Sequence, residues 1–345
     1  MTTVHEALRR WLAREDLSRS ETEELFGQLM DGELSETMKA AMLVALAMKG
    51  EAPSEIAGAA AAMRRRVIAI PHDTERVVDT CGTGGDGKGT FNISTAAALV
   101  AAAAGAPIAK HGNRSVSSRS GSADVLAALG VAIDGTPQDA GRTLQAIGIA
   151  FLFAPKLHPA MKEVMPVRKE LGVRTLFNVL GPLTNPAGAR RQVMGVYARH
   201  LVEVIAAVQV ELGCEHALVV HGADGLDEIT TTAETHVAEV RNGRVEIYEL
   251  SPEDLGLTRC RPEDLAGGSP EDNARLFREV MAGHEGPLAD VTAVNAAAAL
   301  YVSGRVDSLA DGLERARETM ASGEAAGKLE QLIEHSGRTV SSNTV

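Results

Sequence analysis

The sequence predicts an α/β protein of two domains, a small all-helical domain followed by a larger α/β domain with a central, mostly parallel sheet. The chain has 345 residues, more than one compact core of ordinary size holds, which favours two domains. Residues 1–70 carry helix signals throughout. From residue 76, short β-branched runs alternate with loops and small-residue helices, as in sheets that are covered by helices on their faces.

The first 70 residues indicate a set of helices. Ser20 and Glu23 have the S-x-x-E spacing of a capping box, and Pro53 marks another helix start. Residues 40–48, AAMLVALAM, are apolar nearly all round, so we expect this helix to be buried or to lie in an interface.

The remainder indicates strands joined by helices. Strands are expected over residues 75–80, 106–112, 149–155, 191–197 and 216–222. Helices are expected over residues 93–105, 121–130 and 204–213. The stretch from Pro159 to Pro186 interrupts this alternation with helical sequence punctuated by proline.

Net charge, the lengths of the apolar runs and the placing of the cysteines argue against several classes of function. The net charge of −12 argues against non-specific nucleic-acid binding, which depends on positive potential. The longest apolar run is too short to cross a bilayer, and the N-terminal residues lack the apolar stretch of a secretory signal. Cys81, Cys214 and Cys260 form no C-x-x-C pair, so we expect a reduced, cytoplasmic protein. Because of the net charge and the short apolar runs, we expect neither a nucleic-acid nor a membrane partner.

Residues 79–95, DTCGTGGDGKGTFNIST, follow the first predicted strand and match two nucleotide-binding patterns. The P-loop pattern fails because Gly89, and not Ser or Thr, follows Lys88. The dinucleotide pattern fails because the helix begins only near Asn92 and no acidic residue stands at the required position beyond it. A plain strand-to-helix turn is one explanation. A glycine-rich nest of N–H groups beside a polar helix N-terminus is the other, and it predicts a phosphate site.

Two further polar clusters follow other predicted strands. Residues 110–122, KHGNRSVSSRSGS, hold three cations and five serines, which suits a phosphate because cations supply charge and hydroxyl groups supply directional donors. Residues 221–230, HGADGLDEIT, hold the adjacent carboxylates Asp227 and Glu228. Such a pair is often a solvated surface feature, but next to a polyanion it suits Mg²⁺, which prefers one or two carboxylates plus waters and phosphate oxygens.

These clusters, in this order, resemble the anthranilate phosphoribosyltransferase family. Further matches are LFAPKLHPAMKEVMPVRKELGVRTLFNVLGPLTNPA and VNAAAALYV, so the resemblance runs from about residue 79 to about residue 301, with a compatible helical N-terminus. It implies a helical domain, residues 1–70 joined by a returning segment at about 160–186, hinged to an α/β domain of residues 71–159 and 187–345. Nucleoside phosphorylases share this architecture. The family usually forms homodimers through the helical domain.

The resemblance also implies a reaction. The 5-phosphoribosyl group of 5-phospho-α-D-ribose 1-diphosphate (phosphoribosyl diphosphate) passes to the amine of anthranilate, giving N-(5-phosphoribosyl)anthranilate and diphosphate. This is the second step from chorismate in L-tryptophan biosynthesis. It requires Mg²⁺, with two ions expected, and an anthranilate synthase subunit is a further expected partner.

By the same resemblance, residues of the first two clusters bind phosphoribosyl diphosphate. They are Gly82, Thr83, Gly85, Asp86, Thr90, Asn92, Ser94, Thr95, Lys110, Asn113, Ser118 and Ser122. Anthranilate is expected at Gly82, Asn113 and Arg168. Magnesium is expected at Ser94, Asp227 and Glu228.

The chemistry of the expected substrates agrees with these side chains. Loss of diphosphate builds negative charge on the leaving group, which magnesium and Lys110 can neutralise. The nucleophile is an aromatic amine that is already neutral at pH 7, so we name no catalytic base. His111 lies in the second cluster, but a packing or hydrogen-bonding role is at least as good an explanation for it.

Two other functions stay open on the sequence alone. A pyrimidine nucleoside phosphorylase shares the architecture, but its phosphate loop resembles K-x-S-x-R, whereas this chain has KHGNR, and it lacks the adjacent carboxylate pair. A non-catalytic relative that binds nucleic acid needs a basic surface, which the net charge of −12 argues against.

Overall fold

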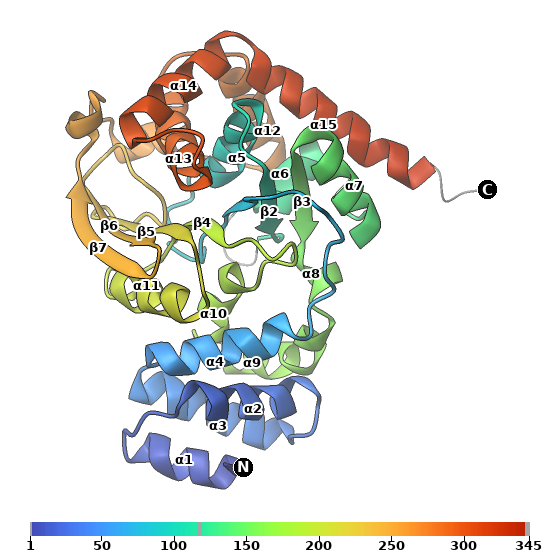
Figure 1. The fold of residues 1–345 in the computed structure, drawn as a ribbon, viewed down its shortest axis with the longest axis vertical. Coiled ribbons are helices and arrows are strands. Elements are labelled where there is room, and N and C mark those ends of the chain that lie inside the picture. The colour runs from blue at the N-terminus through green and yellow to red at the C-terminus, as the bar shows by residue number, and fades with distance from the viewer. Residues whose placement is uncertain (1, 116–118, 342–345) are drawn as a thin grey trace.

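The computed structural model describes residues 2–115 and 119–341, with side chains through residue 337. A helical bundle at one end carries a larger α/β part at the other (Figure 1). None of the described helices is long and apolar enough to cross a membrane.

Four helices form the N-terminal bundle, blue in Figure 1. They are α1 (Val4–Leu12), α2 (Arg19–Met30), α3 (Glu36–Lys49) and α4 (Pro53–Arg64). Ser18 caps α2 in a capping box with Glu21, so the box expected at Ser20 and Glu23 is wrong by two residues. Leu17 explains the difference. Its side chain is buried and its N–H donates to the carboxylate of Glu55 (3.0 Å), which fixes the chain just before Ser18.

Within the described residues, seven strands form one sheet in the order β3-β2-β1-β4-β5-β6-β7. They are β1 (Val78–Thr80), β2 (Ile108–Gly112), β3 (Ile149–Phe153), β4 (Arg191–Gly195), β5 (His216–Gly222), β6 (Thr235–Arg241) and β7 (Arg244–Leu250). The first five strands are parallel, as predicted. An antiparallel hairpin of β6 and β7, which was not predicted, completes one edge.

Helices cover both faces of the sheet. The elements beyond the bundle are α5 (Ile93–Ala103), α6 (Ser122–Leu129), α7 (Pro137–Ile147), α8 (Ala154–Leu157), α9 (Met165–Leu171), α10 (Phe177–Leu180), α11 (Leu201–Glu211), α12 (Pro270–Met281), α13 (Pro287–Ser303), α14 (Leu309–Ala321) and α15 (Glu324–Ser341). Val193 of β4 packs into the core under α5 and α13, whereas the next residue, Met194, packs into the core shared with α11 and the bundle. This alternation within one strand is expected when both faces of a parallel sheet are buried.

The segment between β3 and β4 runs back to the helical bundle. α9 packs on α3, and the Phe177 ring of α10 lies 5.9 Å from the Phe26 ring of α2, measured between centroids. Val167, Leu176 and Leu180 are buried in the same core as the helices of the bundle. The chain therefore passes between the bundle and the α/β part more than once, and it carries Arg168 to the region between them.

Candidate active site

The three polar clusters meet at one edge of the sheet. β1, β2 and β5 each end where a cluster begins, and β4 lies between β1 and β5. Because these strands are parallel, their carboxyl ends share one edge, the usual place for ligands in such sheets. Hydrogen bonds join the clusters. Gly84 N–H donates to Asp227 Oδ2 (2.7 Å), and the amide of Asn92 donates to the carbonyl of Ser120 (3.2 Å).

The glycine loop is held at both ends by backbone hydrogen bonds, and several of its glycines have open space beside them. Thr83 N–H donates to the carbonyl of Gly195 (2.9 Å), and Gly267 N–H donates to the carbonyl of Gly89 (3.0 Å). Gly84, Gly85, Gly87 and Gly89 all have positive φ, between +65° and +78°. At Gly84 and Gly87 no atom lies within 4 Å of where a Cβ would stand. The loop thus presents bare backbone to a ligand, and only glycine adopts these φ angles without strain.

The three expected magnesium ligands come together. Ser94 N–H donates to Glu228 Oε1 (3.2 Å), and Gly82 packs so closely on Asp227 that a Cβ there would lie 2.8 Å from Oδ2. Burial raises the pKa of Asp227 well above its ordinary value, and the neighbouring Glu228 and Asp86 carboxylates raise it further. Burial raises the pKa of Glu228 to about 7, against the opposing effect of Lys110 and Ser94. Crowded carboxylates with a hydroxyl group are hard oxygen donors, and they fit Mg²⁺.

Lys110 supplies a buried positive charge beside these acids. Its Nζ donates to the carbonyl of Thr80 (2.5 Å) and to Ser94 Oγ (3.3 Å). Its side chain is 4% exposed and makes no ion pair with a carboxylate of the described residues. The charge is therefore held in place by neutral oxygens and stays available to an anionic ligand.

The second cluster holds less free charge than the sequence indicates. Arg114 is paired with Asp124 (2.9 Å), and the same carboxylate accepts N–H groups of Ser115 and Gly121. Arg114 is therefore neutralised within the loop, contrary to the expectation of three available cations. Ser118 lies outside the described residues.

The other expected residues of the cluster shape its loop. Asn113 is exposed at the end of β2, and its carbonyl accepts from Ser122 Oγ (3.2 Å) at the start of α6. In the glycine loop, Thr90 forms a β-bridge with Ala266, while Thr95 is buried within α5. Asn273, which sequence reasoning missed, donates to Asn92 Oδ1 (2.8 Å).

Arg168 lies on α9, away from the three clusters in sequence. Its guanidinium lies 5.6 Å from the centroid of the Phe177 ring and makes no hydrogen bond or ion pair with a described residue. Burial lowers its pKa. No hydrogen bond joins it to Gly82 or Asn113 in the described structure. An unpaired, partly buried guanidinium suits a ligand carboxylate.

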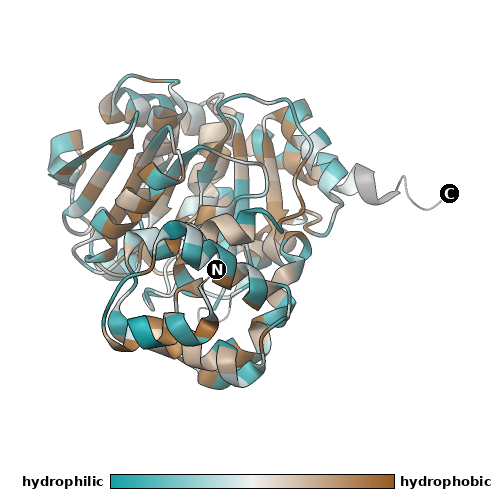
Figure 2. Cartoon of the chain, turned by 60° about the horizontal axis from the view of Figure 1, so that its bottom comes forward, coloured by the Kyte–Doolittle hydropathy of each residue, from teal (hydrophilic) through white to brown (hydrophobic). Residues whose placement is uncertain are grey.

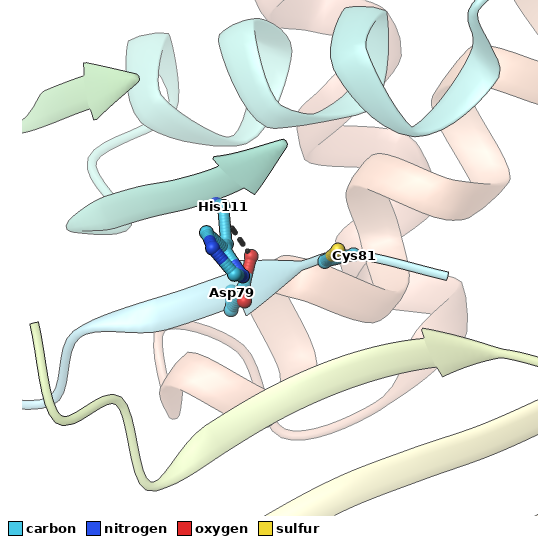
Figure 3. Close-up of side chains that lie close together, drawn as sticks. All are labelled: Asp79, Cys81 and His111. Carbon is cyan, nitrogen blue, oxygen red and sulfur yellow. Dashed lines mark hydrogen bonds between the residues drawn. The ribbon is translucent and has the colours of Figure 1, made fainter. Parts of the chain in front are cut away.

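A second group of ligand-type side chains lies behind the loop. Figure 3 shows Asp79, Cys81 and His111, whose ligand atoms lie within 4.8 Å of one another. The His111 ring is fully used, since Nδ1 donates to the carbonyl of Gly181 (3.1 Å) and Nε2 then accepts from Nε2 of His158 (3.0 Å). Burial lowers the pKa of His111 to about 3. The group supports β1 and β2, and neither nitrogen of the His111 ring is free to bind a metal ion or to accept a proton from a substrate.

Comparisons with known proteins agree with the fold. Residues 5–67 match the helical bundle domain of a glycosyl transferase family, and residues 74–326 match its a/b domain. Anthranilate phosphoribosyltransferase of Symbiobacterium thermophilum is 51% identical over 96% of this chain and 97% of its own length. The enzyme of Anaeromyxobacter sp. (strain K) is 52% identical over 96% of this chain and 98% of its own.

Solved structures give the same result. The crystal structure of anthranilate phosphoribosyltransferase from Thermus thermophilus superposes with a TM-score of 0.91 at 47% identity, covering 96% of this chain and 99% of that one. The Saccharomyces cerevisiae enzyme in complex with PRPP and Mg has a TM-score of 0.88 at 27% identity, covering 97% and 98%.

The helical bundle and the mostly parallel sheet, each matched by its family model, define a glycosyl transferase of the two-domain type. Within that class, the chain belongs to the anthranilate phosphoribosyltransferase family.

Proposed function

We propose that the protein transfers the 5-phosphoribosyl group of phosphoribosyl diphosphate to the amine of anthranilate, in tryptophan biosynthesis. The observation that carries the proposal is the convergence of the glycine loop, Lys110 and the pair Asp227–Glu228 at one sheet edge. The yeast relative was solved with PRPP and Mg, and also with 4-fluoroanthranilate. The family assignment decides against the pyrimidine nucleoside phosphorylase and the nucleic-acid-binding relative that the sequence left open.

Phosphoribosyl diphosphate would lie between the first two clusters. The open space beside Gly84 and Gly87 supports this position, because phosphate oxygens can approach the loop backbone closely there. The proposed contacts are Gly82, Thr83, Gly85, Asp86, Thr90, Asn92, Ser94, Thr95, Lys110, Asn113, Ser118 and Ser122.

Ser94, Asp227 and Glu228 would hold magnesium, and we propose two ions per bound phosphoribosyl diphosphate. The raised pKa values of the two carboxyl groups support a cation at this place, because a divalent cation offsets the burial of their charges and the repulsion from neighbouring carboxylates. Bound magnesium would supply positive charge to the leaving diphosphate. Lys110 would supply a second, fixed charge beside Ser94, held by the carbonyl of Thr80.

Anthranilate would bind through its carboxylate to Arg168, with Asn113 and Gly82 beside its ring and amine. The amine is neutral at pH 7 and attacks the ribose carbon as the bond to diphosphate breaks, and its proton leaves afterwards to water or phosphate oxygen. No described side chain has to act as a base, and His111 is neutral and already hydrogen-bonded on both ring nitrogens.

We also propose the assembly that the family resemblance implies. Leu12, Val44 and Met48 are 78%, 36% and 75% exposed on the adjacent helices α1 and α3, and this apolar surface supports a homodimer formed through the bundle. Figure 2 brings the bundle forward and shows apolar and polar stretches along its helices. The domain division proposed is residues 1–70 with 160–186, hinged to 71–159 and 187–345. An anthranilate synthase subunit as partner and a cytoplasmic location complete the proposal.

An omission experiment tests the activity. Anthranilate fluorescence should fall when the protein, phosphoribosyl diphosphate and Mg²⁺ are combined. It should stay constant when any one of them is left out or when EDTA is added. Constant fluorescence in the complete mixture would reject the proposed reaction.

A further inference from the structure

Arg174 reaches from the segment packed on the helical bundle to the glycine loop. Its guanidinium donates a hydrogen bond to the carbonyl of Gly85. The residue follows α9, and Leu176 and Phe177 just after it are buried in the core shared with the bundle. The base of the Arg174 side chain is therefore anchored beside the core that the bundle shares with the α/β part, while its tip contacts Gly85 of the loop.

The same guanidinium packs over the aromatic ring of Tyr197. The guanidinium carbon lies 4.1 Å from the centroid of the Tyr197 ring, a cation–π distance. Tyr197 follows β4, and its N–H donates to Thr83 Oγ1 (3.0 Å) at the start of the glycine loop. Tyr197 thus contacts Thr83 at the beginning of the loop through its backbone, and Arg174 through its ring.

The middle of the loop makes a second hydrogen bond, to a carboxylate that a metal ion would also bind. Gly84 N–H donates to Asp227 Oδ2 (2.7 Å), and Asp227 is one of the proposed magnesium ligands. Gly85 has φ of +78°, a region in which a glycine backbone is otherwise free to move. The Arg174 contact uses only a backbone carbonyl, so it is independent of the metal.

We propose that Arg174, supported by Tyr197, is a positioning residue that holds the glycine loop in its phosphate-binding shape. This inference rests on the proposed function. It predicts that Arg174 affects phosphoribosyl diphosphate more than anthranilate, although Arg174 and Arg168 lie on the same segment.

Steady-state kinetics with each substrate varied in turn test the proposal. Arg174→Ala should raise the KM for phosphoribosyl diphosphate by about five- to twentyfold, the range for loss of one charge-assisted hydrogen bond and one exposed cation–π contact. The KM for anthranilate should change by less than about twofold. Arg174→Lys should recover part of the effect, because an ammonium group also donates to a carbonyl but does not stack flat on a ring.

The Tyr197 variants separate the ring from its hydroxyl group. Tyr197→Phe should behave like the wild type, and Tyr197→Leu should show part of the Arg174→Ala effect. Adding Tyr197→Leu to Arg174→Ala should cause little further loss, because both act through one contact. Lys169→Ala, which removes an exposed cation from the same segment, is the matched control and should leave both KM values unchanged.

A measurement made without substrate tests the contact between Arg174 and the loop independently of the proposed reaction. Amide hydrogen exchange in a peptide covering residues 82–91 should be faster in Arg174→Ala than in the wild type or in Lys169→Ala, with unchanged melting temperatures. Equal exchange in all three proteins, or an equal rise of both KM values, would overturn the role of Arg174. An inactive wild type whose loop exchange still responds to Arg174→Ala would reject the reaction and leave the loop contact standing.

Discussion

Replacing Arg168 with Met separates binding of anthranilate from binding of phosphoribosyl diphosphate. The Arg168 guanidinium is partly buried against Phe177, has no partner among the described residues, and has its pKa lowered by burial. Methionine keeps an aliphatic body over the ring and removes the charge. Because that charge is uncompensated in the unliganded protein, Arg168→Met should not lower the melting temperature.

The structure sets the size of the effect on anthranilate. Losing one partner of a desolvated guanidinium–carboxylate pair costs about 2–5 kcal/mol. Arg168 keeps some exposure to solvent, so we take the lower end of that range. About 2 kcal/mol corresponds to a rise of about thirtyfold in the KM for anthranilate, at 1.4 kcal/mol for each factor of ten.

The assay follows anthranilate fluorescence at saturating phosphoribosyl diphosphate and Mg²⁺, then with the roles of the two substrates exchanged. Arg168→Lys should recover only part of the loss, because an ammonium group cannot form the two-pronged contact with a carboxylate. Lys169→Met on the same helix is the control. An equal loss for both substrates would show that Arg168 acts through domain closure, and no loss for either would make it an ordinary helix charge. Both results would refute the carboxylate contact.

Further predictions concern the phosphate and metal residues. Asp227→Asn combined with Glu228→Gln should lower activity at limiting Mg²⁺ at least about tenfold without unfolding the protein, and an unchanged Mg²⁺ titration would remove the metal assignment. Burial raises the pKa of Glu228 from 4.5 to about 7, so the folded protein holds this proton more tightly and the carboxyl group's contribution to stability is lost as the pH rises to about 7. The gain in melting temperature of Glu228→Gln over the metal-free wild type should therefore be larger at about pH 8 than at about pH 5, and a gain independent of pH would contradict the shift. Gly85→Val should abolish calorimetric binding of phosphoribosyl diphosphate, whereas Gly323→Val, at a similar positive φ away from the site, should not, and equal effects would mean that only folding is disturbed. Lys110→Met should lower kcat by roughly a hundredfold, and a normal kcat would exclude its role toward the leaving group.

The sequence predicted the parallel strands better than the edge of the sheet. Each of the five predicted runs contains a strand, because each combines β-branched or other apolar residues with loop signals at its ends. The hairpin of β6 and β7 was missed because charged residues alternate along it and β7 is largely exposed. Asn242 and Gly243, both at positive φ, form the turn between them, and this Asn–Gly pair is the local signal that could have located it.

The part of the candidate site that follows from the order of the strands was predictable. The hydrogen bonds and ion pairs of individual side chains in it were not. Clusters that follow parallel strands meet at one edge, so the neighbourhood of Gly84, Lys110 and Asp227 follows from the order of elements. That Asp124 neutralises Arg114 depends on how one loop folds back on the start of α6. The contact between Arg174 and the glycine loop joins residues 89 positions apart, with no local signal for it.

The central claim is that one molecule of phosphoribosyl diphosphate is joined to one molecule of anthranilate at this sheet edge. Mass spectrometry of a reaction with Mg²⁺, together with a quantitative diphosphate assay, tests it most directly. We expect a product with the mass of N-(5-phosphoribosyl)anthranilate and one diphosphate released for each anthranilate consumed. Release of diphosphate with unchanged anthranilate, giving ribose 5-phosphate by hydrolysis, would contradict it, as would the absence of any product.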